Sequence, residues 1–153
     1  MSHTWYALTD RVMGGRSQGA VSFEADVLRF SGTVSFDNNG GFSSVRGDHA
    51  PLDLSEYSTV TVRYRVQHQS LTLNFNHYNE WYRPNYKAVL PETGMDWKTV
   101  TLPLSELEEY SVGSPTGNKI DQSKLKRIIR LGIMTADKKE GSFNAEVDFI
   151  RFD

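Results

Sequence analysis

The first residues with catalytic potential are 15–19, Gly-Arg-Ser-Gln-Gly, which match the G-x-S-x-G pattern of a serine nucleophile. In hydrolases this serine lies on a sharp turn between a strand and a following helix. Here the residues that follow alternate as in a strand, and no helical period is near. The sequence therefore favours a glycine-rich loop at one end of the fold over a hydrolase site.

Metal chemistry has little support among the usual ligand types. The four histidines, His3, His49, His68 and His77, are scattered, and no pair has H-x-H or H-E-x-x-H spacing. We interpret His77 as a residue at the rim of a strand end. The chain has no cysteine, which excludes thiolate nucleophiles, disulfides and cysteine metal sites. We expect no cofactor.

Two aspartates are the candidates for a structural calcium site. Asp10 lies near the first predicted strand and Asp148 in the last, and the first and last strands of a sandwich often pair. Calcium takes six to eight oxygen ligands, so two carboxylates make an incomplete set. The alternative is that Asp10 caps the neighbouring glycine loop through backbone N–H groups.

The main binding candidate is a polar face on three predicted strands. Residues 59–67, 70–78 and 82–90 each alternate between apolar and polar side chains, the third less cleanly because of Pro84. A two-layer sandwich buries one side of each strand, so we expect the polar sides to form one broad surface. Its polar side chains are Arg63, Arg65, Asn74, Asn76, Tyr78, Arg83, Asn85 and Lys87. The residues that we expect to bind a ligand or partner are Arg46, Arg63, Asn74, Asn76, Tyr78, Trp81 and Arg83.

The chemistry of this face suits a polar ligand. Asn and Arg side chains offer hydrogen-bond donors and acceptors in fixed geometry for hydroxyls, carboxylates or a partner's backbone. Trp81, Tyr82 and Tyr86 supply flat apolar area at the edge, for sugar stacking or a protein contact. Two alternatives remain open: the face is simply solvated, or the aromatic residues belong to the core.

A tight turn precedes Arg46. Residues 37–41, Asp-Asn-Asn-Gly-Gly, predict a chain reversal, and Gly40 or Gly41 is expected to adopt positive φ. The next residues form a strand-like run. We expect Phe42 to anchor in the core and Arg46 to be presented at a defined place.

About ten short strands separated by turn signals, without a long helical period, predict an all-β antiparallel sandwich or jelly roll. Residues 20–24 and 27–35 read as a hairpin, and residues 111–121 as a surface loop. Short helical turns are expected near residues 52–57 and 105–109. We find no repeat and no linker, so we expect one domain over residues 1–153.

Charge and hydropathy limit the partners. Lys and Arg number 17 against 19 Asp and Glu, for a net charge of −2, which gives no overall basic field for nucleic acid or an anionic membrane. No apolar run is long enough to cross a bilayer, and no secretory leader is present at residue 1. We expect a cytoplasmic protein, with a mature secreted domain as the alternative.

Seven segments follow one another in a recognisable order over nearly the whole chain. They are residues 10–17 (DRVMGGRS), 30–35 (FSGTVS), 39–46 (NGGFSSVR), 54–57 (LSEY), 97–105 (WKTVTLPLS), 128–134 (IIRLGIM) and 141–150 (GSFNAEVDFI). Together they resemble the family of the complex I intermediate-associated assembly factor.

The resemblance implies a galactose-binding-like jelly roll, related in architecture to carbohydrate-binding modules. The best-known members of this family are mitochondrial chaperones for respiratory complex I, and the resemblance supplies no catalytic residues. Unlike those members, this sequence shows no transit-peptide pattern, so we expect a bacterial, stand-alone domain.

Two functional hypotheses follow. The first is a non-catalytic, chaperone-like domain that binds other proteins. The second is a carbohydrate-binding module that uses the same polar face for a sugar. An enzyme is not expected, because no acid–base pair or nucleophile is set up by local spacing.

Overall fold

The structure is a computed structural model, and it describes residues 5–9, 18–24, 27–35, 42–137 and 139–153. Gly40, Gly41, Asp10 and the segment 15–17 lie outside the described residues. The expectations for the turn, for the carboxylate of Asp10 and for the serine motif therefore remain predictions.

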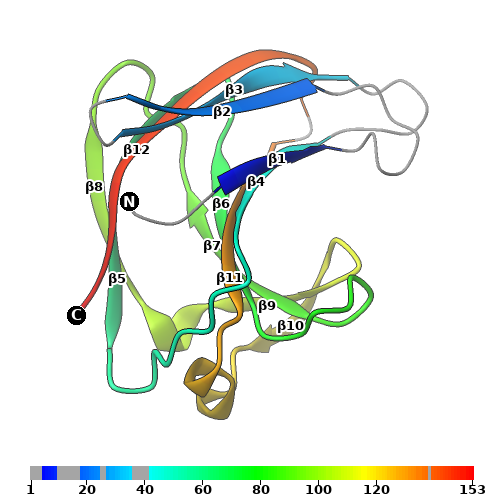
Figure 1. Ribbon diagram of the computed structural model, residues 1–153, viewed down its shortest axis with the longest axis vertical. Coiled ribbons are helices and arrows are strands. Elements are labelled where there is room, and N and C mark those ends of the chain that lie inside the picture. The colour runs from blue at the N-terminus through cyan, green and yellow to red at the C-terminus, as the bar shows by residue number, and fades with distance from the viewer. Residues whose placement is uncertain (1–4, 10–17, 25–26, 36–41, 138) are drawn as a thin grey trace.

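The described residues form two antiparallel sheets that face each other (Figure 1). The seven-stranded sheet has the order β1-β4-β11-β6-β7-β9-β10, and the five-stranded sheet has the order β2-β3-β12-β5-β8. The predicted all-β antiparallel sandwich is confirmed. The first sheet comprises β1 (Trp5–Thr9), β4 (Ser43–Gly47), β11 (Arg130–Thr135), β6 (Leu71–Asn76), β7 (Asn85–Leu90), β9 (Glu108–Ser111) and β10 (Ser114–Lys119); the second comprises β2 (Gln18–Glu24), β3 (Val27–Val34), β12 (Gly141–Phe152), β5 (Thr59–Gln67) and β8 (Lys98–Pro103).

The core lies between the two sheets and follows the alternation of the sequence. Leu28 and Phe30 point inward from β3, and the ring of Phe30 meets that of Phe143 edge-on, with centroids 4.9 Å apart. Such edge-to-face pairs add to the free energy gained from burial. The predicted inward sides of β5 and β6 are confirmed, because Val60, Val62, Tyr64, Val66, Leu71, Leu73 and Phe75 are all fully buried.

The prediction of one polar surface across three successive strands is wrong. β5 belongs to the five-stranded sheet, whereas β6 and β7 belong to the seven-stranded sheet. Residues 68–70 carry the chain from one sheet to the other, so the outward sides of β5 and β6 face opposite ways. Arg63 therefore lies on the other side of the molecule from Asn74. Alternation tells which residues share a strand face but not which sheet the strand joins.

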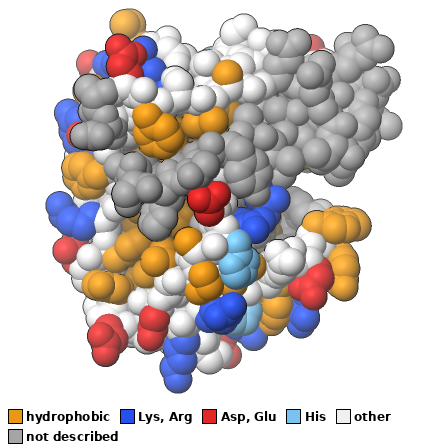
Figure 2. All heavy atoms as spheres, in the orientation of Figure 1, with side chains coloured by type: hydrophobic (Ala, Val, Ile, Leu, Met, Phe, Trp, Pro, Cys, Tyr) orange, Lys and Arg blue, Asp and Glu red, His pale blue; other side chains and the backbone are white. Residues whose placement is uncertain are grey.

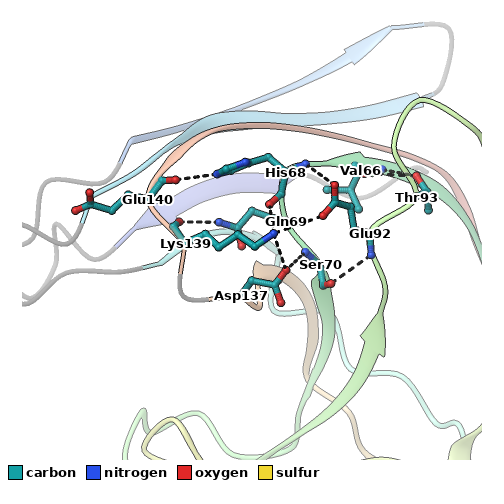
Figure 3. A network of polar contacts seen from close by, with 9 residues as sticks. All are labelled: Val66, His68, Gln69, Ser70, Glu92, Thr93, Asp137, Lys139 and Glu140. Atoms are coloured by element: carbon teal, nitrogen blue, oxygen red, sulfur yellow. Dashed lines mark hydrogen bonds and ion pairs between the residues drawn. The ribbon is translucent and has the colours of Figure 1, made fainter.

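The crossing between β5 and β6 contains a left-handed residue, His68, with φ of 77°. Its ring Nε2–H donates to the backbone oxygen of Glu140 at 2.8 Å (Figure 3). Gly141 has φ of 116°, and a Cβ there would lie 3.1 Å from His68 Nε2. Both the backbone angle and the close approach of the imidazole require glycine at this position.

A lysine joins three loops at the same junction (Figure 3). The Nζ of Lys139 donates to the backbone oxygen of His68 at 3.2 Å, and lies 3.6 Å from Glu92 Oε1 and 3.9 Å from Asp137 Oδ2. Asp137 also accepts from the backbone N–H of Ser70 at 2.8 Å. The ammonium group thus sits among three oxygen atoms from separate segments and fixes where β6 begins.

The segment predicted as a surface loop forms a β-hairpin instead. β9 and β10 pair with an irregular register, and every residue of β10 is exposed. Gly113 and Gly117 have positive φ, at the turn and inside β10. The strand was hidden from sequence reasoning because it is an edge strand with polar, turn-forming residues on both sides.

Helical structure in the described segments includes two short 3-10 helices, η3 (Leu104–Glu106) and η4 (Gln122–Lys126). The helical turn expected near residues 105–109 is confirmed in η3, whereas residues 52–57 contain a turn without a helix. No described helix has the length and apolar composition needed to span a membrane.

Candidate binding face

The seven-stranded sheet curves from β1 and β4 toward β9 and β10, so that its outer face is concave and opens to the right of Figure 1. We call the outward residues of β4, β11, β6, β7 and β9 the concave face. Figure 2 shows the surface hollowed on this side, with basic side chains at its wall. The residues of the concave face are Ser44, Arg46, Arg130, Gly132, Met134, Thr72, Asn74, Asn76, Asn85, Lys87, Val89, Glu108 and Tyr110.

The strand registers place these side chains in rows across the sheet. The central row runs from Arg46 through Gly132, Asn74 and Lys87 to Glu108, each residue opposite the next. In a second row, nearer the loop between β6 and β7, Arg130 faces Asn76 and Asn85 faces Tyr110. A third row, on the other side, contains Ser44, Met134, Thr72 and Val89.

The floor of the concave face is polar and packed. Thr72 and Asn74 are each only 6% exposed, and the hydroxyl of Thr72 donates to Asn74 Oδ1 at 2.8 Å. Beside them Gly132 is buried as well, and a Cβ there would lie 3.8 Å from both Arg46 Cγ and Asn74 Cβ. The side chains of Arg46 and Asn74 therefore pack closely beside the backbone of β11.

Two cations on this face lack a carboxylate partner among the described residues. Lys87 places its Nζ 4.6 Å from the ring centroid of Tyr110, and burial lowers the pKa of this ammonium group. The Nε of Arg130 is buried and has no hydrogen-bond acceptor among the described residues. Unpaired, partly desolvated donors of this kind are suited to an anionic or strongly accepting ligand group.

An aromatic and basic rim closes one end of the concave face, where the loop of residues 77–84 joins β6 to β7. The guanidinium of Arg83 lies 4.0 Å, and the Nζ of Lys124 5.2 Å, from the ring centroid of Tyr78. Trp81 and Tyr82 are 79% and 58% exposed and meet edge-on. Exposed aromatic residues next to a polar floor offer apolar contact area to a bound chain.

The outer face of the five-stranded sheet, which we call the opposite face, has the reverse character. Arg63 donates to Asp148 at 2.8 Å, and Arg65 donates to Glu146 at 2.9 Å. Both guanidinium groups also cover the ring of Trp97, at 4.5 and 4.7 Å. Each of these cations therefore has both a carboxylate and an aromatic partner inside the protein.

The structure separates the predicted binding residues into three groups. Arg46, Asn74 and Asn76 lie on the concave face, and Arg46 is half-buried there. The residues of the 77–84 loop, Tyr78, Trp81 and Arg83, lie at its rim. Of these predicted residues, only Arg63 lies on the opposite face, because β5 belongs to the five-stranded sheet.

Sequence reasoning missed three residues of the concave face, Lys87, Arg130 and Gly132, as members of the candidate site. Lys87 was visible on a polar strand side but was not selected. Arg130 and Gly132 lie in a segment that reads as one apolar run. The alternation of Arg130, Gly132 and Met134 against Leu131 and Ile133 was the available signal.

Two aromatic expectations need correction. Phe42 is half-buried and does not belong to the core, where Val45 of the same segment is fully buried. Tyr86 belongs to the core rather than to the edge of the polar face, with 1% exposure, and its hydroxyl points to Glu109 at 3.4 Å. Burial raises the pKa of Tyr86 to about 12.

The calcium hypothesis for Asp10 and Asp148 remains a prediction, because Asp10 lies outside the described residues. The carboxylate of Asp148 accepts from Arg63, and its strand β12 lies in the five-stranded sheet, whereas β1 lies in the other. The first and last strands therefore do not pair. Within the described ranges, no group of three or more His, Cys, Asp or Glu side chains is placed to hold a metal ion.

Known proteins share this fold and part of this sequence. The family 11 carbohydrate-binding module from Clostridium thermocellum, solved in complex with a β-1,3-1,4-mixed-linked tetrasaccharide, matches with a TM-score of 0.67 and 17% identity, over 97% of this chain and 87% of that one. The family 11 module of the cellulosomal cellulase Lic26A-Cel5E of the same organism matches with a TM-score of 0.58 and 15% identity, over 96% and 87%. At these identities the likeness concerns the jelly-roll fold alone.

No curated protein sequence matches the chain. The sequence model of complex I intermediate-associated protein 30 (CIA30) matches residues 1–147, which leaves only the last six residues outside it. The predicted resemblance is thereby confirmed, and the chain belongs to the complex I intermediate-associated protein 30 family.

Proposed function

We propose that this protein is a non-catalytic binding domain that holds an extended segment of a partner protein on its concave face. The observation that carries this proposal is the central row, in which Arg46, Asn74 and Lys87 are held partly buried across a curved sheet. The family name refers to association with an assembly intermediate of complex I, which supports a protein as the partner. A chaperone-like role in the cytoplasm is part of this proposal.

The arrangement of the floor favours binding over simple solvation. A solvated sheet face keeps its polar groups in contact with water, whereas Thr72 and Asn74 are nearly inaccessible and bonded to each other. Side chains fixed in this way are organised before a ligand arrives, so little conformational entropy is lost on binding. The exposed Trp81 and Tyr82 at the rim are the residue types that dominate protein interfaces.

The chemistry of the floor favours binding without reaction. On the described part of the concave face, no serine or threonine hydroxyl lies beside a histidine, and no pair of carboxylates faces a common space. General acid–base or nucleophilic catalysis needs such pairs.

A glycan is the second candidate ligand, and a specific observation favours it. The jelly roll of this chain is similar to that of a carbohydrate-binding module solved with a tetrasaccharide. The half-buried Asn76 and Asn85 could bond sugar hydroxyls, and Tyr110 or Trp81 could stack on a sugar ring.

The test compares three immobilised versions of the domain: the natural sequence, Gly132→Leu and Lys98→Gln. Gly132→Leu places a bulky side chain in the central row between Arg46 and Asn74, at a position where no positive φ requires glycine and a Cβ would meet Val45 O at 3.4 Å. Lys98→Gln is the control, because Lys98 is an exposed cation of β8, which belongs to the five-stranded sheet and not to the concave face. Thermal melts establish that all three are folded.

We expect a host protein, identified by mass spectrometry, to be captured by the natural domain and by Lys98→Gln but not by Gly132→Leu. The purified partner should then bind with at least tenfold weaker affinity to Gly132→Leu, a difference of about 1.4 kcal/mol. Equal capture by all three versions would exclude the concave face as the site. Retardation in a gel containing mixed-linkage β-glucan, lost in Gly132→Leu, would favour the glycan instead.

A further inference from the structure

The concave face has a charge opposite to that of the whole chain. The outward residues of β4, β11, β6 and β7 include three cations, Arg46, Arg130 and Lys87, and no Asp or Glu. The first carboxylate of the central row is Glu108, on β9. The net charge of the protein is −2, so this cationic area is a local feature and not a consequence of composition.

Two of these charges, on Lys87 and Arg130, are partly desolvated, and no described residue neutralises them. Among the described residues, neither Lys87 nor Arg130 takes part in a salt bridge, and the buried Nε of Arg130 lacks an acceptor. Burial of an unpaired charge destabilises a protein. Two carboxylates from outside the chain, one beside each side chain, would relieve this cost.

The cationic area continues to the rim of the face. The guanidinium of Arg83 and the Nζ of Lys124 lie 4.0 and 5.2 Å from the ring centroid of Tyr78, and neither forms a salt bridge in the described part of the chain. They stand at the same end of the sheet as Arg130. Basic groups therefore extend from the central row to the loop that carries Trp81 and Tyr82.

We propose that the ligand segment is acidic, with carboxylates that pair with Lys87 and Arg130 and aromatic or aliphatic side chains that contact Trp81 and Tyr82. This inference rests on the proposed function, and it adds the chemical class of the partner segment. Carboxylates form the strongest hydrogen bonds with guanidinium and ammonium groups, and Arg can hold one in a bidentate manner.

The positions of the cations also set the spacing of the acidic residues. Lys87 lies two strands away from Arg130 across the sheet, and it is displaced by two residues along the strand direction, as Asn74 is from Asn76. Together these displacements separate the Cα atoms of Lys87 and Arg130 by about 12 Å. An extended chain advances about 3.3 Å per residue, so the two carboxylates should lie about four residues apart. An even spacing also keeps both side chains on the same side of the extended segment.

The experiment uses two fluorescein-labelled peptides of twelve residues that differ only in charge. One has Glu at three positions four residues apart in a Ser/Thr/Val background, and its twin has Gln at those positions. Fluorescence anisotropy measures their binding to the natural domain, to Lys87→Gln, to Arg130→Gln and to the control Lys98→Gln.

We expect the Glu peptide to bind the natural domain at least tenfold more tightly than its Gln twin. Lys87→Gln and Arg130→Gln should each weaken it about fivefold to tenfold, and Lys98→Gln less than twofold. Raising the ionic strength from about 50 to 300 mM should weaken binding of the Glu peptide and leave that of the Gln twin unchanged. Melting temperatures of the three variants verify that the losses are not due to unfolding.

Several results would overturn the inference. They are binding of both peptides to the same extent, binding of neither, and binding of the Glu peptide that is unchanged in Lys87→Gln and Arg130→Gln. Charge-dependent binding of polygalacturonate in place of the peptide would make the ligand an acidic glycan. If the partner captured through Gly132 binds equally well to both charge variants, the proposed function stands and only its acidic character is wrong.

Discussion

The two outer faces of this sandwich contain similar residue types in different states. On the opposite face, Arg63 and Arg65 cover Trp97 and are each paired with a carboxylate. On the concave face, Lys87 lies over Tyr110 in the same manner, but no carboxylate among the described residues completes the arrangement. Both faces thus use a cation against an aromatic ring, and they differ in whether the charge is neutralised.

This difference separates a structural cation from one available for binding. A partly buried charge that is paired contributes to folding, and its removal leaves the partner charge uncompensated. A partly buried charge without a partner makes folding less favourable, so its presence needs another reason. The pairing of a cation, rather than its presence on a polar strand side, is therefore the better indicator of a binding role.

The largest effect on stability is expected at Glu146, whose side chain is 11% exposed and lies between Arg65 and Arg29 at 2.9 and 3.8 Å. Glu146→Gln should lower the free energy of unfolding by about 2 kcal/mol, because Arg65 loses its carboxylate in a nearly buried position, whereas Arg29 keeps its pair with Glu24. Chemical denaturation measures this. A loss below about 0.5 kcal/mol would mean that the ion pairs of the opposite face contribute no more to stability than those of an ordinary surface.

A smaller loss is expected at Arg63. Arg63→Ala removes the pair with Asp148 and the contact with Trp97, but both partners of the pair are more than a third exposed. The free energy of unfolding should fall by about 1 kcal/mol, with capture of the partner protein unchanged. If Arg63→Ala loses partner capture while its melting temperature is unchanged, Arg63 belongs to a second binding surface. Pairing with a carboxylate would then not distinguish structural cations from binding cations.

On the concave face, removal of a cation should stabilise. Lys87→Met should raise the free energy of unfolding by about 0.5–1 kcal/mol at pH 7, because burial disfavours the ammonium form. The pKa of Lys87 is lower in the folded than in the unfolded protein, so its penalty is full below the folded pKa. The penalty disappears above the ordinary value of 10.5.

The advantage of Lys87→Met over the natural sequence should accordingly shrink as the pH rises toward 10.5. Denaturation series at pH 7, 9 and 10.5 measure this trend, with Lys98→Gln as a control whose difference stays constant. A destabilised Lys87→Met variant at pH 7 would show that the contact with Tyr110 outweighs the cost of burial.

The smallest effect on stability is expected at the rim. Trp81→Ala should change the free energy of unfolding by less than about 0.5 kcal/mol, because the side chain is 79% exposed. Its effect on partner binding should be larger, about 1 kcal/mol or more. Calorimetric titration with the purified partner gives the second value. An unchanged affinity would restrict the interface to the floor of the concave face.

Much of the fold was predictable from local patterns. The alternation of Val60, Val62 and Tyr64 against polar neighbours specified both the strand and its buried side, and the core confirms it. The β2–β3 hairpin and the closing strand were equally clear. These features depend on residues close in the sequence, where the period of two is directly visible.

The candidate site was only partly predictable, because it depends on which strands become neighbours. Asn74 lies next to Gly132 and Lys87 through pairings of β6 with β11 and β7. The β6–β11 pairing joins segments more than fifty residues apart, and no local pattern specifies it. For the same reason the sequence predicted Arg63 and Asn74 on one surface. The chain passes from one sheet to the other after β5, and the alternation of apolar and polar residues does not show this crossing.

The ammonium group of Lys139 holds the loops together at the junction between the two sheets, where a bound metal ion would otherwise be one way to do so. It occupies a position among His68, Glu92 and Asp137 where oxygen atoms from three segments converge on one positive charge. If a free cation occupied such a place, the stability that it adds to the folded protein would rise and fall with the concentration of that ion. A covalently tethered cation has a constant local concentration, so the loops are held together without any free cation being bound, and dissolved salt acts on these exposed contacts only through screening.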